Sequence, residues 1–480
     1  MTDNVFKNFI GGEWVAGNST VTNISPSDRS DVIGQYAQAS HEQVDQALKA
    51  ARKAQVHWAE SGLEYRYRVL YAIGQELIDR KEELGRLLSR EEGKTLAEGV
   101  GEVYRSGQFF HYYAAEVLRQ MGDTADSVRP GIEIETRREP VGVVAVITPW
   151  NFPMATPAWK IAPALAFGNA VVYKPANLVP ASAWALTEII SRQDLPPGTF
   201  NLVMGSGKEV GDTLAHSTAV DAITFTGSLG VGRQIATACG PNLIKLQLEM
   251  GSKNALVVLD DADLDLAADC AINGAYSGTG QKCTASSRLI VTEGIHDAFV
   301  AKVIERLEKF RVGPALEQGV QMGPAVDEKQ LRQNLDYIEQ ARREGAELAF
   351  GGERLTELGD GYYMRPALFI NTRNDMTVNR DEIFGPIACV IKVRDYEEAL
   401  ATLNDTQYGL TAGIITQSLK YASHFKRHAR TGCVMVNLPT AGTDYHVPFG
   451  GRKHSSFGPR EQGQYAREFY TVVKTSYIRA

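Results

Sequence analysis

Hydrophobic and polar positions divide the chain into a helical N-terminal part and a longer part in which strands and helices alternate. From about residue 41 to residue 118, apolar residues recur at steps of three and four, which predicts helices with one buried face. Ser40 precedes the first of these helices and is a suitable N-cap. Ahead of the helices, FIGGEWV alternates around two glycines and predicts an edge hairpin.

After residue 122, short β-rich apolar runs alternate with helical segments. The strand AVVYKPA is followed by the helix ASAWALTEIISRQD, and the strand AITFTGS by the helix GVGRQIATACG. This rhythm predicts a parallel sheet with helices on both faces. A second set of strands and helices follows Gly251, so we predict an α/β protein with two tandem Rossmann-like parallel-sheet domains, divided near Gly251 and Ser252.

Composition and charge narrow the class of protein. The 480 residues include 50 basic and 57 acidic side chains, an acidic, mixed balance that argues against a nucleic-acid-binding surface. Five cysteines, an odd number without paired spacing, favour a reducing compartment. The sequence has neither a signal-like N-terminus nor an apolar run of membrane-span length. We therefore expect a cytoplasmic protein that binds neither membrane nor nucleic acid.

One cysteine lies in a segment that suits chemistry. Cys283, in SGTGQKCTASSR, belongs to a small, polar, glycine-rich loop that can bring backbone close to a substrate. A thiolate there would be a strong nucleophile toward a carbonyl carbon, although an incidental loop cysteine is the alternative. The other four fall in helical or strand-like runs and are expected to be small buried hydrophobes: Cys239, Cys270, Cys389 and Cys433.

A nucleophilic cysteine needs a base and a group that stabilises the oxyanion. Glu249, in LEMGSKN, stands where an apolar run meets a turn, and partial burial would raise its pKa toward the range of a general base. Asn151 follows VVAVITPW, so its amide could donate to an oxyanion at the end of a buried strand. The alternatives are an ion-paired glutamate and a turn asparagine before Pro153. We expect no metal site.

Two turns and a lysine suggest a phosphate-bearing ligand. AITFTGSLGVG places Gly227 and Ser228 between a strand and a helix, where backbone N–H groups suit a pyrophosphate. MGSGKEVG, with Gly207 and Gly211, is a similar turn. Neither turn matches G-x-G-x-x-G, so tight turns without a ligand are an alternative. Lys174 ends a strand at the sheet edge where open α/β proteins bind ligands, unless it is simply solvated.

Together, these segments resemble the aldehyde dehydrogenase family. The similarity runs from FIGGEWV to TVVKTSY and depends on seven motifs in the family's order. They are TPWNFP (148–153), YKPA (173–176), FTGS (225–228), LEMGSKN (248–254), GQKC (280–283), EIFGP (382–386) and PFGG (448–451). Seven ordered motifs at compatible spacing leave little room for chance.

The resemblance implies a role for each candidate residue. Cys283 would attack the aldehyde carbon, while Asn151 and the Cys283 backbone N–H hold the oxyanion. Hydride transfer to NAD or NADP leaves a thioester, and Glu249 activates the water that hydrolyses it. The residues expected to bind the cofactor are Thr148, Trp150, Lys174, Asn177, Gly207, Gly211, Gly227, Ser228, Met250, Glu382 and Phe384. Those expected to bind the aldehyde are Arg105, Phe152 and Phe449.

The same resemblance implies a division of the chain. Residues 1–122 and 142–251 would form the NAD(P)-binding domain, and residues 252–445 the catalytic domain that carries the cysteine. Residues 123–141 and 464–480 would form a small β arm that pairs across subunits. We therefore expect a homodimer or a homotetramer.

Two positions depart from the family pattern. Many NAD-preferring relatives have an acidic residue where this sequence has Asn177, and that acid would repel the 2′-phosphate of NADP. A neutral side chain removes the repulsion, so we expect NADP to be preferred or both cofactors to be used. Ser252 stands where a second glycine is common, and its hydroxyl could restrict the turn.

The segment NLPTAGTDYHVPFGGRKHSSFGPREQGQYAREFY is similar to that of dehydrogenases that oxidise α-ketoglutaric semialdehyde (2,5-dioxopentanoate), an intermediate of sugar-acid catabolism. Arg105, in the helix EVYRSGQFFHYYAAE, would bind the carboxylate of this substrate, unless it is a surface arginine. The alternative substrates are succinate semialdehyde and a broad set of aliphatic or aromatic aldehydes. A non-catalytic binding protein would need neither Cys283 nor Glu249, and Glu249 favours water over coenzyme A as the acyl acceptor. We therefore expect a non-acylating dehydrogenase.

Overall fold

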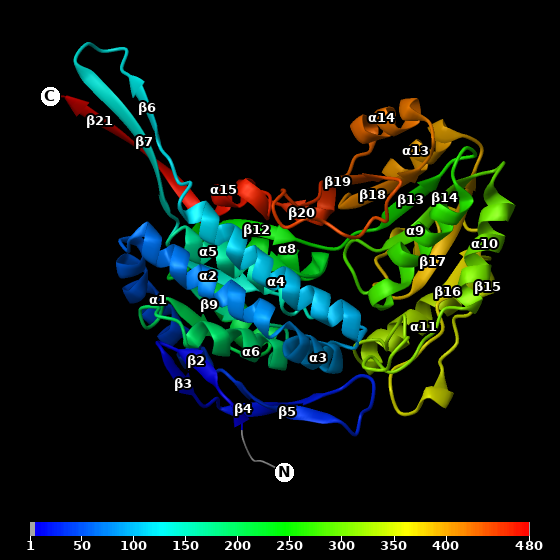
Figure 1. The fold of residues 1–480 in the computed structure, drawn as a ribbon, viewed down its shortest axis with the longest axis horizontal. Helices are drawn as coiled ribbons and strands as arrows, with labels where there is room; N and C mark the ends of the chain where they lie inside the picture. Colours follow the sequence, from blue (N-terminus) through cyan, green and yellow to red (C-terminus); the bar gives the residue numbers. More distant parts are fainter. Residues whose placement is uncertain (1–4, 480) are drawn as a thin grey trace.

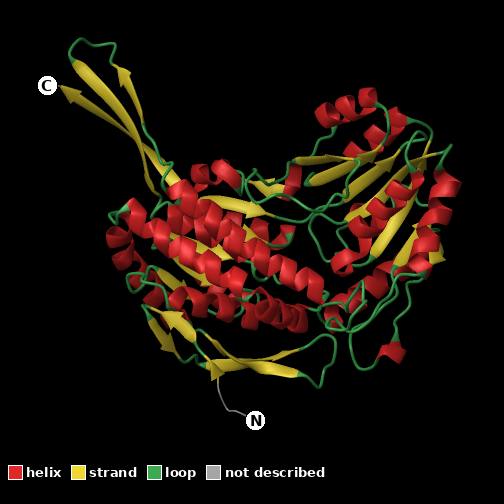
Figure 2. Ribbon diagram, in the orientation of Figure 1, coloured by secondary structure: helices red, strands yellow, loops and turns green. Residues whose placement is uncertain are grey.

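Four β-sheets organise the chain in a computed structural model that describes residues 5–479 (Figure 1). Two of the sheets are large and lie in separate lobes, each with helices on its faces (Figure 2). The other two have three strands each, and one of these projects from the molecule as an arm. Within the described residues, no helix is both long and apolar enough to span a membrane. The predicted α/β fold class is confirmed.

The first large sheet has eight strands, of which the central five are parallel. In spatial order they are β20 (Ser456–Phe457), β12 (Lys245–Glu249), β11 (Ala222–Thr226), β8 (Val143–Ile147), β9 (Ala170–Lys174), β10 (Phe200–Leu202), β2 (Asn8–Ile10) and β3 (Glu13–Val15). The strands β8 and β9 are buried throughout, as continuous apolar runs in a parallel sheet require. The predicted N-terminal hairpin is confirmed as the antiparallel pair β2 and β3.

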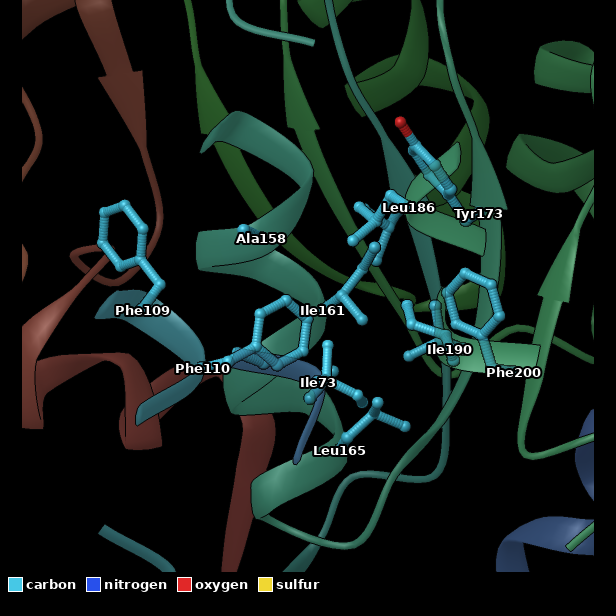
Figure 3. Close-up of a cluster of buried hydrophobic side chains, with 14 of the residues drawn as sticks. Ile73, Phe109, Phe110, Ala158, Ile161, Leu165, Tyr173, Leu186, Ile190 and Phe200 are labelled. Carbon is cyan, nitrogen blue, oxygen red and sulfur yellow. The ribbon is translucent and has the colours of Figure 1, made fainter. Parts of the chain in front are cut away.

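Helices cover both faces of this sheet, and each face forms its own hydrophobic core. One face carries α1 (His41–Ala59), α7 (Asp212–His216) and α8 (Leu229–Cys239). The other carries α2 (Leu63–Asp79), α3 (Lys81–Glu92), α4 (Leu96–Val117), α5 (Ala155–Ala166) and α6 (Pro180–Ser191). Figure 3 shows part of this second core, where Ile73 of α2, Phe110 of α4 and Leu165 of α5 gather. The predicted N-cap is confirmed, since the Ser40 hydroxyl accepts from the Gln43 N–H.

The second large sheet has seven strands, six of them parallel. In spatial order they are β15 (Glu347–Phe350), β16 (Ala367–Ile370), β17 (Ile387–Val393), β14 (Ser286–Thr292), β13 (Asn254–Val258), β18 (Thr411–Ile415) and β19 (Cys433–Val436). The helices packed on it are α9 (Leu264–Tyr276), α10 (His296–Glu308), α11 (Glu328–Arg343), α12 (Thr377–Arg380), α13 (Tyr396–Asn404) and α14 (Leu419–His428).

The small sheets bring together segments that are distant in the sequence. One joins β1 (Val5–Phe6), β5 (Val32–Gln38) and β4 (Ser19–Ile24). The other is the projecting arm, in which β7 (Ile132–Pro140) pairs with both β6 (Asp123–Asp126) and β21 (Thr471–Arg479). Short helical turns complete the structure: η1 (Gly207–Gly211), η2 (Gly240–Asn242), η3 (Ser277–Gly280), η4 (Thr356–Leu358), η5 (Lys453–Ser455), η6 (Gly463–Ala466) and α15 (Arg467–Tyr470).

The sequence pattern did not indicate the strand β20. It pairs antiparallel with β12, so that Ser456 lies opposite Glu249 at the end of the first sheet. Two residues are too few to show the alternation that marks a strand. The position of β20 beside β12 therefore depends on tertiary packing and not on a local sequence pattern.

Candidate active site

The predicted nucleophile lies in a loop that leads into the second sheet. Cys283 follows η3 and precedes β14, and its side chain is half-buried. Gly280 has a φ of 63°, in the left-handed region that favours glycine. A Cβ at this position would lie 2.3 Å from the carbonyl oxygen of Gly385, so a larger residue does not fit. The glycine-rich loop thus brings the cysteine against the EIFGP segment.

Of the other cysteines, Cys239, Cys270 and Cys389 are buried, as expected. The expectation of full burial is wrong for Cys433, which is half-buried. This residue begins β19, the last strand of the second sheet, and a strand at a sheet edge has a neighbour on one side only.

Asn151 lies just after β8, next to the cysteine loop. Its side chain is buried, and Nδ2 donates to the carbonyl oxygen of Gln281 at 3.0 Å. A carboxamide nitrogen carries two hydrogens, so Asn151 has a second N–H to offer. Asn151 and Cys283 line the same two cavities, and the bond to Gln281 uses only one of the two N–H groups.

A buried ion pair that the sequence analysis missed holds the Asn151 loop. Lys94 Nζ lies 2.6 Å from Glu102 Oε2 and donates to the Asn151 carbonyl oxygen at 2.7 Å. The other Glu102 oxygen accepts from the N–H groups of Met154 and Ala155, at 2.9 and 3.1 Å, where α5 begins. An acidic partner is favourable there, because the first N–H groups of a helix lack intrahelical acceptors. The only sequence signal is a glutamate on the buried face of a predicted helix.

Glu249 ends β12 and is buried. The Ser456 hydroxyl of β20 donates to Glu249 Oε2 at 2.5 Å. Burial, and then the nearby Glu461 carboxylate, raise the pKa of Glu249 well above its usual value, the direction expected from the sequence. The carboxylate faces Ser456 and Gly450, and Glu249 does not line either of the two cavities beside Cys283 in the described structure.

Two further buried charges lie close to Glu249. Lys160 of α5 forms an ion pair with Glu461, and both side chains are almost completely inaccessible to solvent. Lys160 Nζ also donates to the Thr224 hydroxyl at 2.9 Å. The lysine favours an ionised Glu249, whereas Glu461 opposes it. Local patterns do not connect Lys160 with Glu461, because the two are 301 positions apart.

Cys283 lies at the junction of two cavities. The first has a volume of about 310 Å³ and contains the three residues expected to bind the aldehyde: Arg105, Phe152 and Phe449. The second, of about 270 Å³, lies toward the ends of β8, β11 and β12. Four residues line both cavities, namely Asn151, Phe152, Trp159 and Cys283. Ligands in the two cavities would therefore meet at the cysteine.

Six of the eleven residues expected to bind the cofactor line the second cavity: Trp150, Gly227, Ser228, Met250, Glu382 and Phe384. The rings of Trp150 and Phe384 meet edge to face, with centroids 5.4 Å apart. Burial raises the pKa of Glu382 to about 7, and the Ser252 N–H donates to one of its oxygens at 2.9 Å. The cavity thus has an aromatic wall and a half-buried carboxyl group.

The other five lie outside this cavity, in and around the ends of β8 and β9 and in the turn before α7: Thr148, Lys174, Asn177, Gly207 and Gly211. Lys174 Nζ donates to the carbonyl oxygen of Pro175 at 2.7 Å, and burial lowers the pKa of Lys174 to about 8. Gly211 lies against this lysine, since a Cβ there would be 3.9 Å from Lys174 Cε. Asn177 Nδ2 donates to Gln38 Oε1 at 3.2 Å.

The groups around the second cavity fit a nicotinamide dinucleotide. Ser228 is the N-cap of α8, an eleven-residue helix whose first N–H groups suit phosphate oxygens. A Cβ on Gly251 would lie 2.0 Å from Glu382 Oε2, so glycine is required where the backbone passes the carboxyl group. An ionised carboxylate can accept from ribose hydroxyls, and aromatic rings can contact a nicotinamide ring. The phosphates, one ribose and the nicotinamide ring would therefore each find a suitable group around this cavity.

A glutamine pair that sequence reasoning missed supports this wall. Gln330 of α11 donates Nε2 to the carbonyl oxygens of Ile383 and Phe384, both at 3.1 Å, and Gln333 donates to Ile383 at 3.0 Å. Phe384 has a φ of 62°, which is uncommon for a residue other than glycine. The two glutamines stabilise this backbone conformation from a helix about fifty residues away in the chain.

The surroundings of Cys283 keep its thiol protonated at neutral pH. Burial raises the pKa of Cys283 to about 12, and the carboxyl groups of Glu382, Glu249 and Glu461 add to the effect. A neutral thiol is a poor nucleophile, so attack on a carbonyl requires loss of this proton.

Comparison with known proteins shows which protein family the chain belongs to. The profile of the aldehyde dehydrogenase family matches residues 14–476, so the chain belongs to that family and is an oxidoreductase that acts on aldehydes. It is 42% identical over 480 residues to the α-ketoglutaric semialdehyde dehydrogenase of Bacillus subtilis (strain 168), covering 99% of this chain and 98% of the relative. It is 39% identical over 472 residues to the 2,5-dioxopentanoate dehydrogenase of Saccharolobus solfataricus, covering 98% of each.

Solved structures agree with this assignment. The betaine aldehyde dehydrogenase of Staphylococcus aureus in complex with NAD+ superposes with a TM-score of 0.96 at 33% identity, covering 98% of this chain and 95% of that one. The family and this complex support the use of NAD or NADP by the present chain.

Proposed function

We propose that this chain oxidises α-ketoglutaric semialdehyde (2,5-dioxopentanoate) to α-ketoglutarate with NAD or NADP, and that water accepts the acyl group. Two relatives, at 42% and 39% identity across nearly the whole chain, are named for this semialdehyde. The observation that carries the proposal is a cysteine between two cavities, one of which has an arginine in its wall. Succinate semialdehyde is the second candidate, since it also combines an aldehyde with a carboxylate.

Arg105 is the residue that suits the carboxylate of such a substrate. It lies half-buried in the wall of the first cavity, with its guanidinium 5.4 Å from the ring centre of Tyr445. In residues 5–479, the ion pairs of α4 involve Glu102 and Glu116, and none includes Arg105. A planar guanidinium can bind both oxygens of a carboxylate, so Arg105 can hold the acidic end of the substrate.

The first half of the reaction joins the substrate to Cys283. Once its proton has passed to solvent water, Sγ bonds to the aldehyde carbon, and the electron pair of the C=O π bond moves to the oxygen, which becomes negative. The second N–H of Asn151 donates to this oxygen and stabilises the charge. A bound nicotinamide would supply the hydride acceptor, after which the sulfur carries the acyl group as a thioester.

The second half of the reaction uses Glu249 as a base. Its raised pKa makes it a stronger base than an ordinary carboxylate. Because the side chain is bonded to Ser456 outside both cavities, this role requires it to turn toward Cys283. Glu249 then takes a proton from water, the water oxygen bonds to the acyl carbon, and the C–S bond breaks. The product leaves as a carboxylate, and the cysteine is restored.

For the cofactor, the proposal is that NADP is preferred. Asn177 is neutral and bonded to Gln38, so it offers no negative charge against a 2′-phosphate. Lys174, three residues earlier, supplies a positive charge. The ratio of kcat/KM for NADP and NAD measures this preference, and a ratio well below one would contradict it.

The arm supports a homodimer or homotetramer. Within residues 5–479, the edge strand β21 pairs only with β7, and it has exposed apolar side chains, including Val473 and Tyr477, each 60% exposed. An exposed edge of this kind is a template for pairing with another chain. Truncation before Thr471 is therefore expected to lower the mass measured by sedimentation, whereas an unchanged mass would contradict this role.

The substrate is tested by kcat/KM for α-ketoglutaric semialdehyde, succinate semialdehyde and a neutral aldehyde of similar length. We expect the first to be the best substrate and Arg105→Ala to lower its kcat/KM about tenfold to a hundredfold, from the loss of a charge-assisted hydrogen bond. Arg105→Lys keeps the charge and is expected to lose less, while the neutral aldehyde is expected to react nearly as before. Equal losses on all three aldehydes would contradict the role of Arg105.

A further inference from the structure

Ser252 lies in the turn between β12 and β13 and is almost fully buried. It makes three hydrogen bonds there. Its hydroxyl donates to Asn254 Oδ1 at 2.6 Å and accepts from the Leu410 N–H at 3.3 Å. Its own N–H donates to Glu382 Oε1 at 2.9 Å. One small residue thus connects the turn after Glu249 with the residue that precedes β18 and with the wall of the second cavity.

Asn254 continues this network to the nucleophile. Its Nδ2 donates to the carbonyl oxygens of Cys283 and Ala285, at 2.7 and 3.0 Å. Its Oδ1 accepts from the Thr411 N–H at 3.0 Å as well as from the Ser252 hydroxyl. A carboxamide has two donor hydrogens and two acceptor lone pairs, so every hydrogen-bonding position of Asn254 is used. The amide therefore has one orientation, in which it holds the cysteine loop by its carbonyl oxygens.

We propose that Ser252 is a positioning residue, which acts through Asn254 to keep Cys283 Sγ at the junction of the two cavities. Ser252 lines neither of the two cavities, and both hydrogen bonds of its hydroxyl are to the protein, so the hydroxyl does not bind a ligand there. Without the Ser252 hydroxyl, Asn254 Oδ1 loses one hydrogen-bond donor. The buried Leu410 N–H loses its acceptor, which lies at 3.3 Å. The cysteine loop then samples more than one position, and the fraction with Sγ at the junction falls. The proposal assumes that Cys283 is the nucleophile but not which aldehyde it attacks.

Three substitutions separate the parts of this network. Ser252→Ala removes only the hydroxyl, Ser252→Gly also frees the backbone that bonds Glu382, and Ser252→Thr keeps the hydroxyl. A matched control is Thr372→Val, because the buried Thr372 hydroxyl also makes one bond in each direction. It donates to the Val390 carbonyl oxygen at 2.7 Å and accepts from Asn379 Nδ2 at 3.1 Å, away from both cavities.

The first measurement is the rate at which iodoacetamide alkylates Cys283, followed by peptide mass spectrometry, with Cys283→Ala as the blank. Ser252→Ala is expected to slow alkylation about threefold to tenfold, which corresponds to the free energy of one or two modest hydrogen bonds. Ser252→Thr is expected to restore the wild-type rate of alkylation. Thr372→Val is expected to alkylate at the wild-type rate even if its thermal unfolding midpoint falls. A wild-type rate for Ser252→Ala, or no rescue by threonine, would overturn the proposal.

Two further measurements separate positioning from simple loss of stability. For Ser252→Ala, the single-turnover rate of thioester formation is expected to fall with alkylation, while the aldehyde KM and the Kd for NADP stay within about twofold of wild type. Ser252→Gly is expected to weaken NADP binding as well, because its backbone is free to leave Glu382. Because alkylation needs no aldehyde, an enzyme that failed to oxidise the semialdehyde would refute the proposed function and leave this test of Ser252 intact.

Discussion

The two cavities that meet at Cys283 are built in different ways. The second is bordered by segments that follow β8, β11 and β12, with glycines at 227 and 251, and by side chains of α5 and α11. The first is bordered by side chains of α4 and of distant loops, several of them charged. The second cavity therefore depends on how three strand ends of the first sheet meet α5 and α11, whereas the first depends on the side chains that α4 and the loops present.

This difference separates the expected effects of substitution. Changes in the first cavity should alter which aldehyde reacts, while changes in the second should alter cofactor use for every aldehyde. The residues shared by both cavities should affect every reaction, because both ligands are proposed to meet there.

The largest effect is expected at the shared boundary. Cys283→Ala removes the proposed nucleophile, so aldehyde oxidation should fall at least about a thousandfold for every aldehyde. The Kd for NADP, measured by titration of the protein fluorescence, should change less than about twofold, because the rest of the second cavity is intact. Aldehyde oxidation at the wild-type rate would contradict the mechanism.

Glu249→Gln should lower steady-state kcat about a hundredfold or more, because water then lacks its base. Rapid mixing should still give a burst of reduced nicotinamide close to one per active site, since thioester formation precedes this step. Because only the ionised carboxylate accepts a proton and its pKa is raised, kcat of the wild type should rise with pH through this pKa. The variant should lose that rise, and a variant without a burst would place Glu249 in the first half of the reaction.

Substitution of Glu102 in the first cavity should lower both the free energy of unfolding and kcat. Glu102→Gln leaves the buried Lys94 without its closest carboxylate, which should cost about 3–5 kcal/mol of unfolding free energy in urea titrations. The double variant Lys94→Met with Glu102→Leu should recover part of that stability, because no charge is left unpaired but the N–H groups of Met154 and Ala155 still lack their acceptor. Its kcat should stay low for all aldehydes, because the Asn151 carbonyl has lost the lysine. Full recovery of kcat would show that the ion pair does not position Asn151.

The smallest effect is expected at Asn177, at the far end of the proposed cofactor site. Asn177→Glu should lower kcat/KM for NADP about fivefold or more beyond its effect on NAD. Like charges about 4 Å apart repel by about 1 kcal/mol in bulk water and about 4 kcal/mol near a protein surface. Asn177→Gln, which stays neutral, is the matched control and should keep the ratio within about threefold of wild type. Equal losses of kcat/KM with both cofactors would show that Asn177 does not determine the choice of cofactor.

The local patterns predicted much of the fold and part of the site. The alternation of strands and helices, the N-terminal hairpin and the cap at Ser40 follow from spacing and residue type over short stretches. The glycine-rich setting of Cys283 was also visible, because a tight loop needs glycine wherever it is found. The roles assigned to Cys283, Glu249 and Asn151 came from the family resemblance and stay predictions.

Long-range partners could not be predicted in this way. Nothing near Lys160 indicates that it meets Glu461, and nothing near Glu249 indicates that Ser456 holds its carboxylate. A buried charge needs a partner, but which residue supplies it depends on how helices and sheets pack. The same holds for Gln330, which reaches the Phe384 backbone from another helix.

The amino-acid sequence by itself determined the order of strands and helices, the positions of the tight turns and the kinds of reactive side chain, because these depend on neighbours in the chain. Only the tertiary structure decided that Glu249 faces Ser456, that Lys94 and Glu102 hold the Asn151 loop, and that Ser252 reaches Cys283 through Asn254. The reason is physical. Burial and hydrogen-bond partners are properties of packed surfaces, and residues far apart in the sequence supply most of the atoms on those surfaces.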